Sequence, residues 1–120
     1  MKLKQFGAHT KRVRALVVLS ICTLASGSDD FTIRIWNINS GLMIQELKRH
    51  QDLVYSLALL SNGNLASASA DKIIRIWDLK SGHTEKKLVG HTRIVSALAC
   101  LNNGMLASGS FDASIRIWKF

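Results

Sequence analysis

The chain repeats itself every 41 residues, and this period constrains the fold more than any other feature of the sequence. Three histidines and three tryptophans recur at this spacing, namely His9, His50, His91, Trp36, Trp77 and Trp118. No insertion interrupts the register between the first repeat and the last. A fixed period of roughly 20–50 residues indicates an array of similar supersecondary units, each packed against its neighbours. We therefore expect three copies of one structural unit.

Each repeat is expected to contain four short β-strands. Short β-branched runs bounded by Gly, Asn, Asp and Ser are typical of strands, and the absence of proline fits uninterrupted ladders. Each unit would have an outer strand before the His, a strand soon after it, a serine-rich strand and a strand that ends in Trp. These are expected at 2–6, 43–48 and 84–89, then from Val13, Val54 and Val95, then at 24–28, 65–69 and 106–110, and last at 32–36, 73–77 and 114–118. The chain is therefore expected to be all-β.

Glycine-containing pairs mark the turns between these strands. Asn62-Gly63 and Asn103-Gly104 offer the positive φ angles of a tight hairpin between the first two inner strands of their repeats. The first repeat has Ile21-Cys22 at the equivalent place, so its hairpin should have a different shape. Ser40-Gly41 and Ser81-Gly82 are expected to turn the chain from the Trp strand to the next outer strand.

A Ser, a His and an Asp recur together in each repeat, which is the composition of a catalytic triad. The three sets are Ser26 with His9 and Asp30, Ser67 with His50 and Asp71, and Ser108 with His91 and Asp112. An active site is normally a single constellation at a pocket, whereas a feature present in every unit belongs to the architecture of that unit. We therefore expect no catalytic residue and no enzymatic activity.

The marker residues of each period together resemble the WD40 (WD-repeat) β-propeller family. They are the His, a Leu-Ala-Ser-Gly-Ser run or its Ala variant, the Asp and an Ile-Arg-Ile-Trp run, and they span the whole chain. The Trp-Asp dipeptide of the family occurs once, at Trp77-Asp78, while Asn37 and Lys119 stand at the other two positions. The resemblance implies four-stranded antiparallel blades of a β-propeller.

The resemblance also implies a structural tetrad in every blade. In it the indole N–H of Trp bonds Ser, the Ser hydroxyl bonds His, and His bonds Asp. The implied tetrads are His9, Ser26, Asp30 and Trp36; His50, Ser67, Asp71 and Trp77; and His91, Ser108, Asp112 and Trp118. Such a network, once complete, fixes the turn and the strand register.

Three blades are fewer than the four to eight of a typical propeller. We expect a single domain over 1–120, with an outer strand in 1–8, repeats at 9–49 and 50–90, and a third repeat at 91–120 that lacks its outer strand. Two interpretations stay open. In the first, two copies join as a homodimer into a six-bladed ring, strand 2–6 of each completing blade 114–119 of the other. In the second, the chain is part of a longer propeller.

Two classes of partner follow from the surface. In the family, the residues three and five positions after the His and the residue before the Asp often contact protein partners. The first candidate function is therefore a scaffold that binds proteins through these loops, which lie on the top face of the blades. The matching residues are Arg12, Arg14, Asp29, Leu53, Tyr55, Ala70, Ile94, Ser96 and Phe111. The net charge of +8 supports the alternative, an anionic partner such as RNA, DNA or a phosphoinositide. Aromatic side chains that could stack on bases are sparse.

No cofactor and no metal ion is expected. His83 is the only histidine outside the repeat pattern, and Cys22 and Cys100 occupy non-equivalent positions, which favours two reduced thiols. The apolar run 15–25 follows basic residues and imitates a signal peptide, but it aligns with strands of the other repeats and is too short to span a bilayer. We expect an intracellular protein, cytoplasmic or nuclear, without a transmembrane segment.

Overall fold

The computed structural model describes residues 4–7 and 9–120, and its described residues form β-strands and no helix. The strands are β1 (Val13–Val18), β2 (Thr23–Ser28), β3 (Ile33–Asn37), β4 (Met43–Leu47), β5 (Val54–Leu59), β6 (Leu65–Ser69), β7 (Ile74–Asp78), β8 (His83–Leu88), β9 (Val95–Cys100), β10 (Leu106–Ser110) and β11 (Ile115–Trp118). The all-β prediction is confirmed, and most strands begin and end within two residues of their expected positions.

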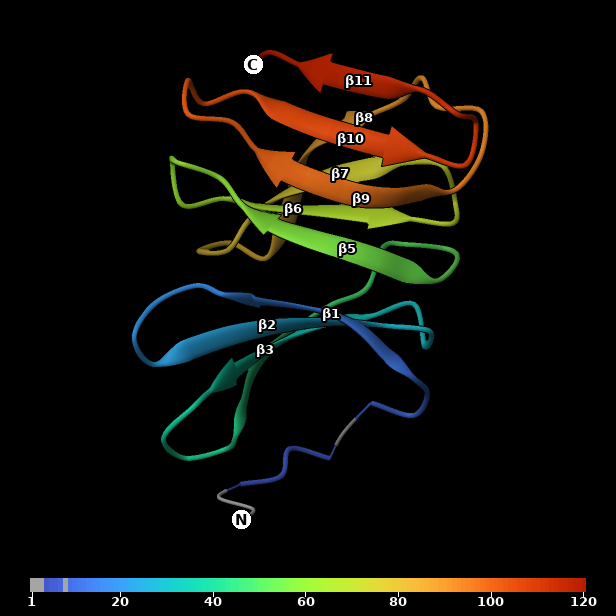
Figure 1. Cartoon of the computed structure of the whole chain (residues 1–120). Helices are drawn as coiled ribbons and strands as arrows, with labels where there is room; N and C mark the ends of the chain where they lie inside the picture. Colours follow the sequence, from blue (N-terminus) through green and yellow to red (C-terminus); the bar gives the residue numbers. More distant parts are fainter. Residues whose placement is uncertain (1–3, 8) are drawn as a thin grey trace.

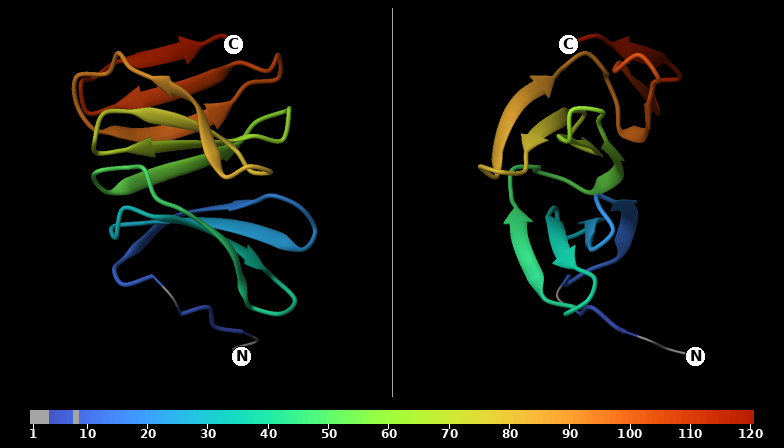
Figure 2. Two further views of the ribbon diagram at one scale, coloured as in Figure 1. Left: turned by 180° about the vertical axis from the view of Figure 1, so that it is seen from behind. Right: turned by 90° about the vertical axis from the view of Figure 1, so that its left-hand side faces the viewer.

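The strands form three antiparallel sheets in chain order, each of which is one blade. Blade 1 has the order β1-β2-β3-β4, blade 2 the order β5-β6-β7-β8, and blade 3 consists of β9-β10-β11. The blades stack side by side, with blade 1 at one end of the stack and blade 3, which leads to the C-terminus, at the other (Figures 1 and 2). The inner strands β1, β5 and β9 contact one another from blade to blade. Among the described residues, blade 3 has no fourth strand.

The outer strand expected at 2–6 does not form within the single chain over the residues that can be judged. Lys4, Gln5 and Phe6 belong to no strand, while residues 1–3, including Lys2, and Ala8 lie outside the described residues. The physical reason is the lack of a ladder partner, because the open edge of blade 3 lies at the opposite end of the stack (Figure 1). Phe6 instead packs on Trp36, with ring centroids 5.5 Å apart.

In the two hairpin turns with an Asn-Gly pair, the glycine alone adopts the positive φ angle. Gly63 and Gly104 have φ angles of 89° and 81°, and each amide donates to the carbonyl three residues earlier. The preceding asparagines keep negative φ, so the expected Asn-Gly turn with two positive φ angles is replaced by a longer one with a single left-handed glycine. The Ile21-Cys22 hairpin has no positive φ, and its Ser20 hydroxyl lies 2.7 Å from Oγ1 of Thr23. Its different shape is confirmed.

Hydrophobic side chains fill the space between neighbouring blades. Between blades 1 and 2 the fully buried residues include Ile33, Leu47, Val54 and Leu65. A second cluster joins blades 2 and 3, and it includes Ala66, Ala68, Ile74, Val95 and Leu106. Because blade 2 has a neighbour on both sides, β6 is buried along its whole length. The fold is therefore held together chiefly by contacts between blades.

Equivalent side chains are buried in blade 2 and exposed at the two ends of the stack. Leu16 of blade 1 is 63% exposed, whereas its counterpart Leu57 in blade 2 is 8% exposed. Ile115 of blade 3 is 78% exposed, whereas its counterpart Ile74 is fully buried. The first and third blades therefore each present an apolar face that no described residue covers.

Candidate functional site

The structure brings the four marker residues of each repeat into one hydrogen-bonded chain. In blade 2, Nε1 of Trp77 donates to Oγ of Ser67 at 2.8 Å, and that oxygen lies 2.6 Å from Nε2 of His50. Nδ1 of the same imidazole lies 2.8 Å from Oδ2 of Asp71. Because an ionised carboxylate only accepts, Nδ1 carries the proton of its hydrogen bond to Asp71, while Nε2 and the Ser67 hydroxyl share the second hydrogen bond of the imidazole. The hydrogen-bonded chain therefore runs from the indole through Ser67 and His50 to the carboxylate of Asp71.

The other two blades repeat this geometry. The indole nitrogens of Trp36 and Trp118 each lie 2.8 Å from their serine oxygens. The corresponding histidine-to-serine distances are 2.6 and 2.7 Å, and the histidine-to-aspartate distances are 2.8 and 2.9 Å. Ser67 is fully buried and Ser108 is 1% exposed, so these hydroxyls lie inside the folded blades.

Each tetrad aspartate also fixes a tight turn, whose left-handed residue sequence reasoning missed. Asp71 accepts the backbone amides of Gln51 at 3.1 Å and of Ile73 at 3.0 Å. The intervening residue, Lys72, has a φ of 74°, a left-handed conformation that non-glycine residues rarely adopt. Phe31 and Ala113 are strained in the same way at φ of 73° and 68°. The sequence signal for this turn was an Asp that stands, in every repeat, two residues before a β-branched residue or a serine.

The aspartates are held in their charged form. Burial raises the pKa of Asp71, but the hydrogen bond and charge of His50, together with backbone amides, outweigh it and bring this pKa to about 2. Burial likewise raises the pKa of Asp30. Hydrogen bonds from Thr32 and His9 outweigh this effect and set the pKa well below its ordinary value. In blade 3 the hydrogen bond from Ser114 is the main cause that lowers the pKa of Asp112.

The top face is the end of the blades that carries the loops after each His and the turns before each Asp. Backbone hydrogen bonds join the expected partner-binding positions in pairs. These run from the amide of Asp29 to the carbonyl of Arg12 at 2.8 Å, from Ala70 to Leu53 at 2.9 Å, and from Phe111 to Ile94 at 2.9 Å. The scaffold of each blade therefore places both loops of the top face side by side.

Four of these residues form a continuous row across all three blades. The guanidinium of Arg14 makes two hydrogen bonds to the carboxylate of Asp29, and its Cζ lies 4.8 Å from the ring centroid of Tyr55. Tyr55 meets Phe111 edge to face, with centroids 6.1 Å apart. The hydrogen bond to Asp29 raises the pKa of Arg14 more than burial lowers it. We call Asp29, Arg14, Tyr55 and Phe111 the top-face row.

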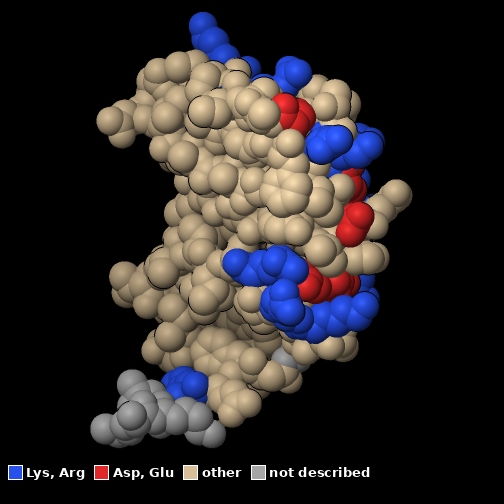
Figure 3. Space-filling view, turned by 45° about the vertical axis from the view of Figure 1, so that its right-hand side comes forward, with Lys and Arg blue, Asp and Glu red and all other residues tan. Residues whose placement is uncertain are grey.

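The remaining candidates frame this row with smaller or less prominent side chains. Arg12 is exposed, while Leu53, Ala70, Ile94 and Ser96 are half-buried. Phe111 is 55% exposed although it is a large apolar residue. Figure 3 shows the molecule with the right-hand side of Figure 1 brought forward, and Lys and Arg cover more of the face in view than Asp and Glu do.

The other expectations concern thiols, metals and membranes. Cys22 and Cys100 are free thiols, and His83 is exposed. Over residues 4–7 and 9–120, no group of three His, Cys, Asp or Glu side chains is arranged to hold a metal ion. The same residues contain no helix of the length and hydrophobicity that would cross a bilayer.

Comparisons with known proteins agree with this architecture. The family model of the WD domain, G-beta repeat, matches residues 1–37, 41–78 and 82–119. The solved structure of the WD40 beta propeller domain of Doa1 superposes with a TM-score of 0.94 at 29% identity, over 98% of this chain and 40% of that one. The U3 small nucleolar RNA-associated protein 15 homolog of Xenopus laevis is 39% identical over 51 residues, which are 42% of this chain and 10% of that protein. The chain therefore spans less than half the length of either relative. Its repeats, its blades and these matches show that it belongs to the WD40 (WD-repeat) β-propeller family.

Proposed function

We propose that the chain is a non-catalytic scaffold that binds a protein partner through the loops of its top face. The observation that carries this proposal is the top-face row, in which three successive blades contribute Arg14, Tyr55 and Phe111 to one surface. Arginine and tyrosine are enriched among the residues that dominate binding energy at protein interfaces, and aromatic residues in general are enriched there.

The row is ordered before a partner arrives. Asp29 holds the guanidinium of Arg14, which packs on Tyr55. An ordered surface loses less conformational entropy on binding than flexible loops do. The tetrads fit the same proposal, because their buried serines act as framework and supply no nucleophile to the surface.

The test is quantitative capture of partners from a lysate by wild-type and variant chains. Tyr55→Ala and Phe111→Ala should each reduce recovery of the same specific partner at least tenfold. Ile21→Ala is the matched control, because Ile21 is fully exposed in the hairpin at the opposite end of blade 1. The proposal fails when a partner recovered by the wild-type chain is lost equally from the control, or kept by both row variants.

A second candidate function is binding of an anionic partner such as RNA, DNA or a phosphoinositide. The excess of 16 Lys and Arg over 8 Asp and Glu favours it, and one relative carries a name that associates it with U3 small nucleolar RNA. By that analogy the chain would act with RNA in the nucleus. A titration with labelled RNA at low and moderate salt tests this, since electrostatic binding weakens steeply with salt. Binding that is absent at low salt would remove this candidate.

We also propose that the two apolar end faces are covered by further blades. A second copy of this chain would supply them by closing a six-bladed ring, and blades of a longer propeller would do so equally. Exposed Leu16 at one end and Ile115 at the other support the need for a cover. Analytical ultracentrifugation should give twice the monomer mass of 13.3 kDa when the ring forms. A well-folded monodisperse monomer would contradict the dimer.

A further inference from the structure

The middle of every Trp strand carries an arginine, but its cross-strand neighbour differs between the two complete blades. In blade 1, Arg34 stands opposite Glu46, and Nη2 lies 2.9 Å from Oε2 of that carboxylate. In blade 2, Lys87 stands opposite Arg75 at the equivalent place in the ladder. A cation therefore occupies the position from which the first blade neutralises its arginine.

Arg75 is buried and forms no ion pair with a described residue. The residue is 8% exposed, and its Nε has neither solvent nor a hydrogen-bond acceptor within reach. No hydrogen bond or ion pair joins its guanidinium to any described residue. Oγ1 of Thr84, nearby on β8, is likewise buried without a partner. Unsatisfied buried donors of this kind are rare in native structures and call for a missing acceptor.

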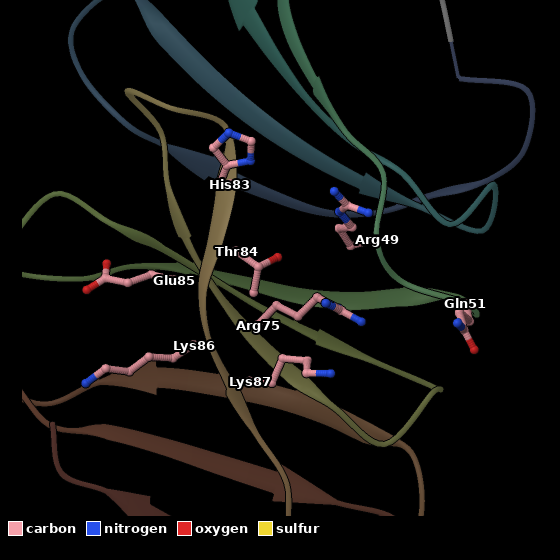
Figure 4. Close-up of a pocket in the computed structure, with 8 residues that line it drawn as sticks. All are labelled: Arg49, Gln51, Arg75, His83, Thr84, Glu85, Lys86 and Lys87. Atoms are coloured by element: carbon pink, nitrogen blue, oxygen red, sulfur yellow. The ribbon is translucent and has the colours of Figure 1, made fainter.

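These groups face a hollow beside β8. Its volume is about 580 Å³, and Figure 4 shows Arg75, Thr84 and Lys87 on the same side of β8, toward the segment that carries Arg49. That segment links blade 1 to blade 2, so the hollow lies at the junction of the two blades. No described residue accepts a hydrogen bond from the side chains of Arg49 or Lys87. We call Arg49, Arg75, Lys87 and Thr84 the junction cluster.

The remaining charged side chains of the hollow have other contacts. Glu85 points away from the junction cluster in Figure 4, and its Oε2 accepts a hydrogen bond from Nδ2 of Asn64 at 2.6 Å. Lys86 also points away, with its ammonium 5.2 Å from the ring centroid of Phe120. Burial lowers the pKa of Arg75, and the charge of Arg49 adds to this effect while Asp71 opposes it. The junction cluster is therefore a concentrated positive charge with no carboxylate among its own members.

We propose that the junction cluster is a binding site for a phosphate group. Three cationic side chains and an unpartnered hydroxyl match an anion with several acceptor oxygens and more than one negative charge, and guanidinium pairs especially well with phosphate. A carboxylate would leave most of the positive charge uncompensated. This site is separate from the top-face row, so it stands whether or not that row binds a protein.

The repeats themselves supply the test variants. Lys87→Glu introduces the residue that blade 1 has at this position, Glu46, and should turn Arg75 into a paired arginine like Arg34. Arg49→Ala introduces the residue of the first repeat, where the sequence has Ala8. Lys119→Glu is the matched control, because it makes the same charge change at an exposed position of blade 3.

Isothermal titration of the full chain with pyrophosphate at low salt measures the site directly. The wild-type chain should bind one equivalent saturably, and Lys87→Glu and Arg49→Ala should each weaken binding at least tenfold. Lys119→Glu should stay within twofold of the wild type. Thermal unfolding shows whether each variant folds, and Arg49→Ala alone decides the matter when Lys87→Glu does not fold, since Arg49 is an exposed side chain outside the sheets.

A second arm identifies the source of the phosphate. Titration with a single-stranded RNA oligonucleotide presents the same group as a phosphodiester. A tenfold loss of RNA binding in both cluster variants would assign the site to a nucleic-acid backbone, and unchanged RNA binding beside weakened pyrophosphate binding would assign it to a free phosphate ligand. The proposal is overturned when pyrophosphate fails to saturate, when Lys119→Glu weakens binding as much as Lys87→Glu, or when a Glu-rich peptide binds and pyrophosphate does not.

Discussion

The tetrads and the top-face row stand a few residues apart in each blade and follow opposite rules. The tetrad positions hold the same four residue types in all three repeats and have nearly the same distances in each. The position of Arg14, by contrast, becomes Tyr55 in the second repeat and Ser96 in the third. A residue repeated in every blade serves a need that every blade shares, whereas a residue that changes from blade to blade serves one place on the assembled surface.

The same rule applies to the ladder between the Trp strand and the outer strand. Arg34 and Arg75 are repeated, but Glu46 gives way to Lys87. Repetition alone would have predicted an ion pair in both blades. The break in the repeat marks the junction cluster, just as the break at Tyr55 marks the top-face row. This comparison teaches that departures from the 41-residue period carry the information on binding.

The largest effect should follow removal of a tetrad residue in the most buried blade. Ser67→Ala leaves the indole N–H of Trp77 and the imidazole of His50 without their shared partner, which should cost about 2–4 kcal/mol of unfolding free energy. Urea unfolding measures this. Ser61→Ala is the control, because Ser61 is exposed in a hairpin of the same blade and should change stability by less than about 0.5 kcal/mol. Equal effects of the two variants would break the comparison.

The second-largest effect on stability should come from acid, which weakens the tetrads. The folded-state pKa of Asp71 is about 2 and its ordinary value is 3.8, so its contribution to stability is complete above pH 4 and disappears as the pH falls toward 2. With allowance for solvent screening, this contribution amounts to about 1 kcal/mol. The melting temperature should therefore fall between pH 4 and pH 2, and less steeply in Asp71→Asn. A variant with the same slope as the wild type would contradict the role of this carboxylate.

A substitution in the junction cluster should have a smaller effect on the unfolding free energy, and it should stabilise the chain. Lys87→Glu should stabilise the chain by about 0.2–1 kcal/mol at low salt, because it gives Arg75 the ion pair that Arg34 has. The melting temperatures of Lys87→Glu and Lys119→Glu are compared by thermal unfolding. The difference between them separates the new ion pair with Arg75 from the general effect of lowering the net positive charge. Equal shifts in the two variants would show that Arg75 does not gain a specific partner.

The smallest effect on stability should come from the top-face row. Phe111 is 55% exposed, so Phe111→Ala should change the unfolding free energy by no more than about 0.5 kcal/mol. The same substitution should greatly reduce partner capture. A destabilisation as large as that of Ser67→Ala would show that the row belongs to the framework, and the distinction between the two regions would be lost.

Much of the fold follows from the sequence because its determinants are local and repeated. The serine-rich and Trp strands alternate at fixed spacing, and the period predicts which four residues meet in each blade. The strand expected at 2–6 does not form over residues 4–6 of the single chain because a strand also needs a partner, and the sequence of Phe6 and its neighbours contains no information on where that partner lies.

The binding surfaces were harder to predict because they join residues from different repeats. The nine top-face candidates came from family positions, but the contact between Tyr55 and Phe111 depends on how blade 2 faces blade 3. The junction cluster was missed entirely, since a lysine such as Lys87 on an outer strand commonly serves only to protect a sheet edge. Alignment of Glu46 with Lys87 at the 41-residue spacing was the signal that could have found it.

The central claim is that repeated residues maintain the fold and unrepeated residues bind. The most direct measurement is the affinity of a captured partner for Ser67→Ala and Phe111→Ala at a temperature at which both variants are folded. The account predicts near wild-type affinity for Ser67→Ala, despite its lower melting temperature, and at least tenfold weaker binding for Phe111→Ala, whose melting temperature is unchanged. Loss of binding in the folded Ser67→Ala chain, together with full affinity in Phe111→Ala, would contradict it.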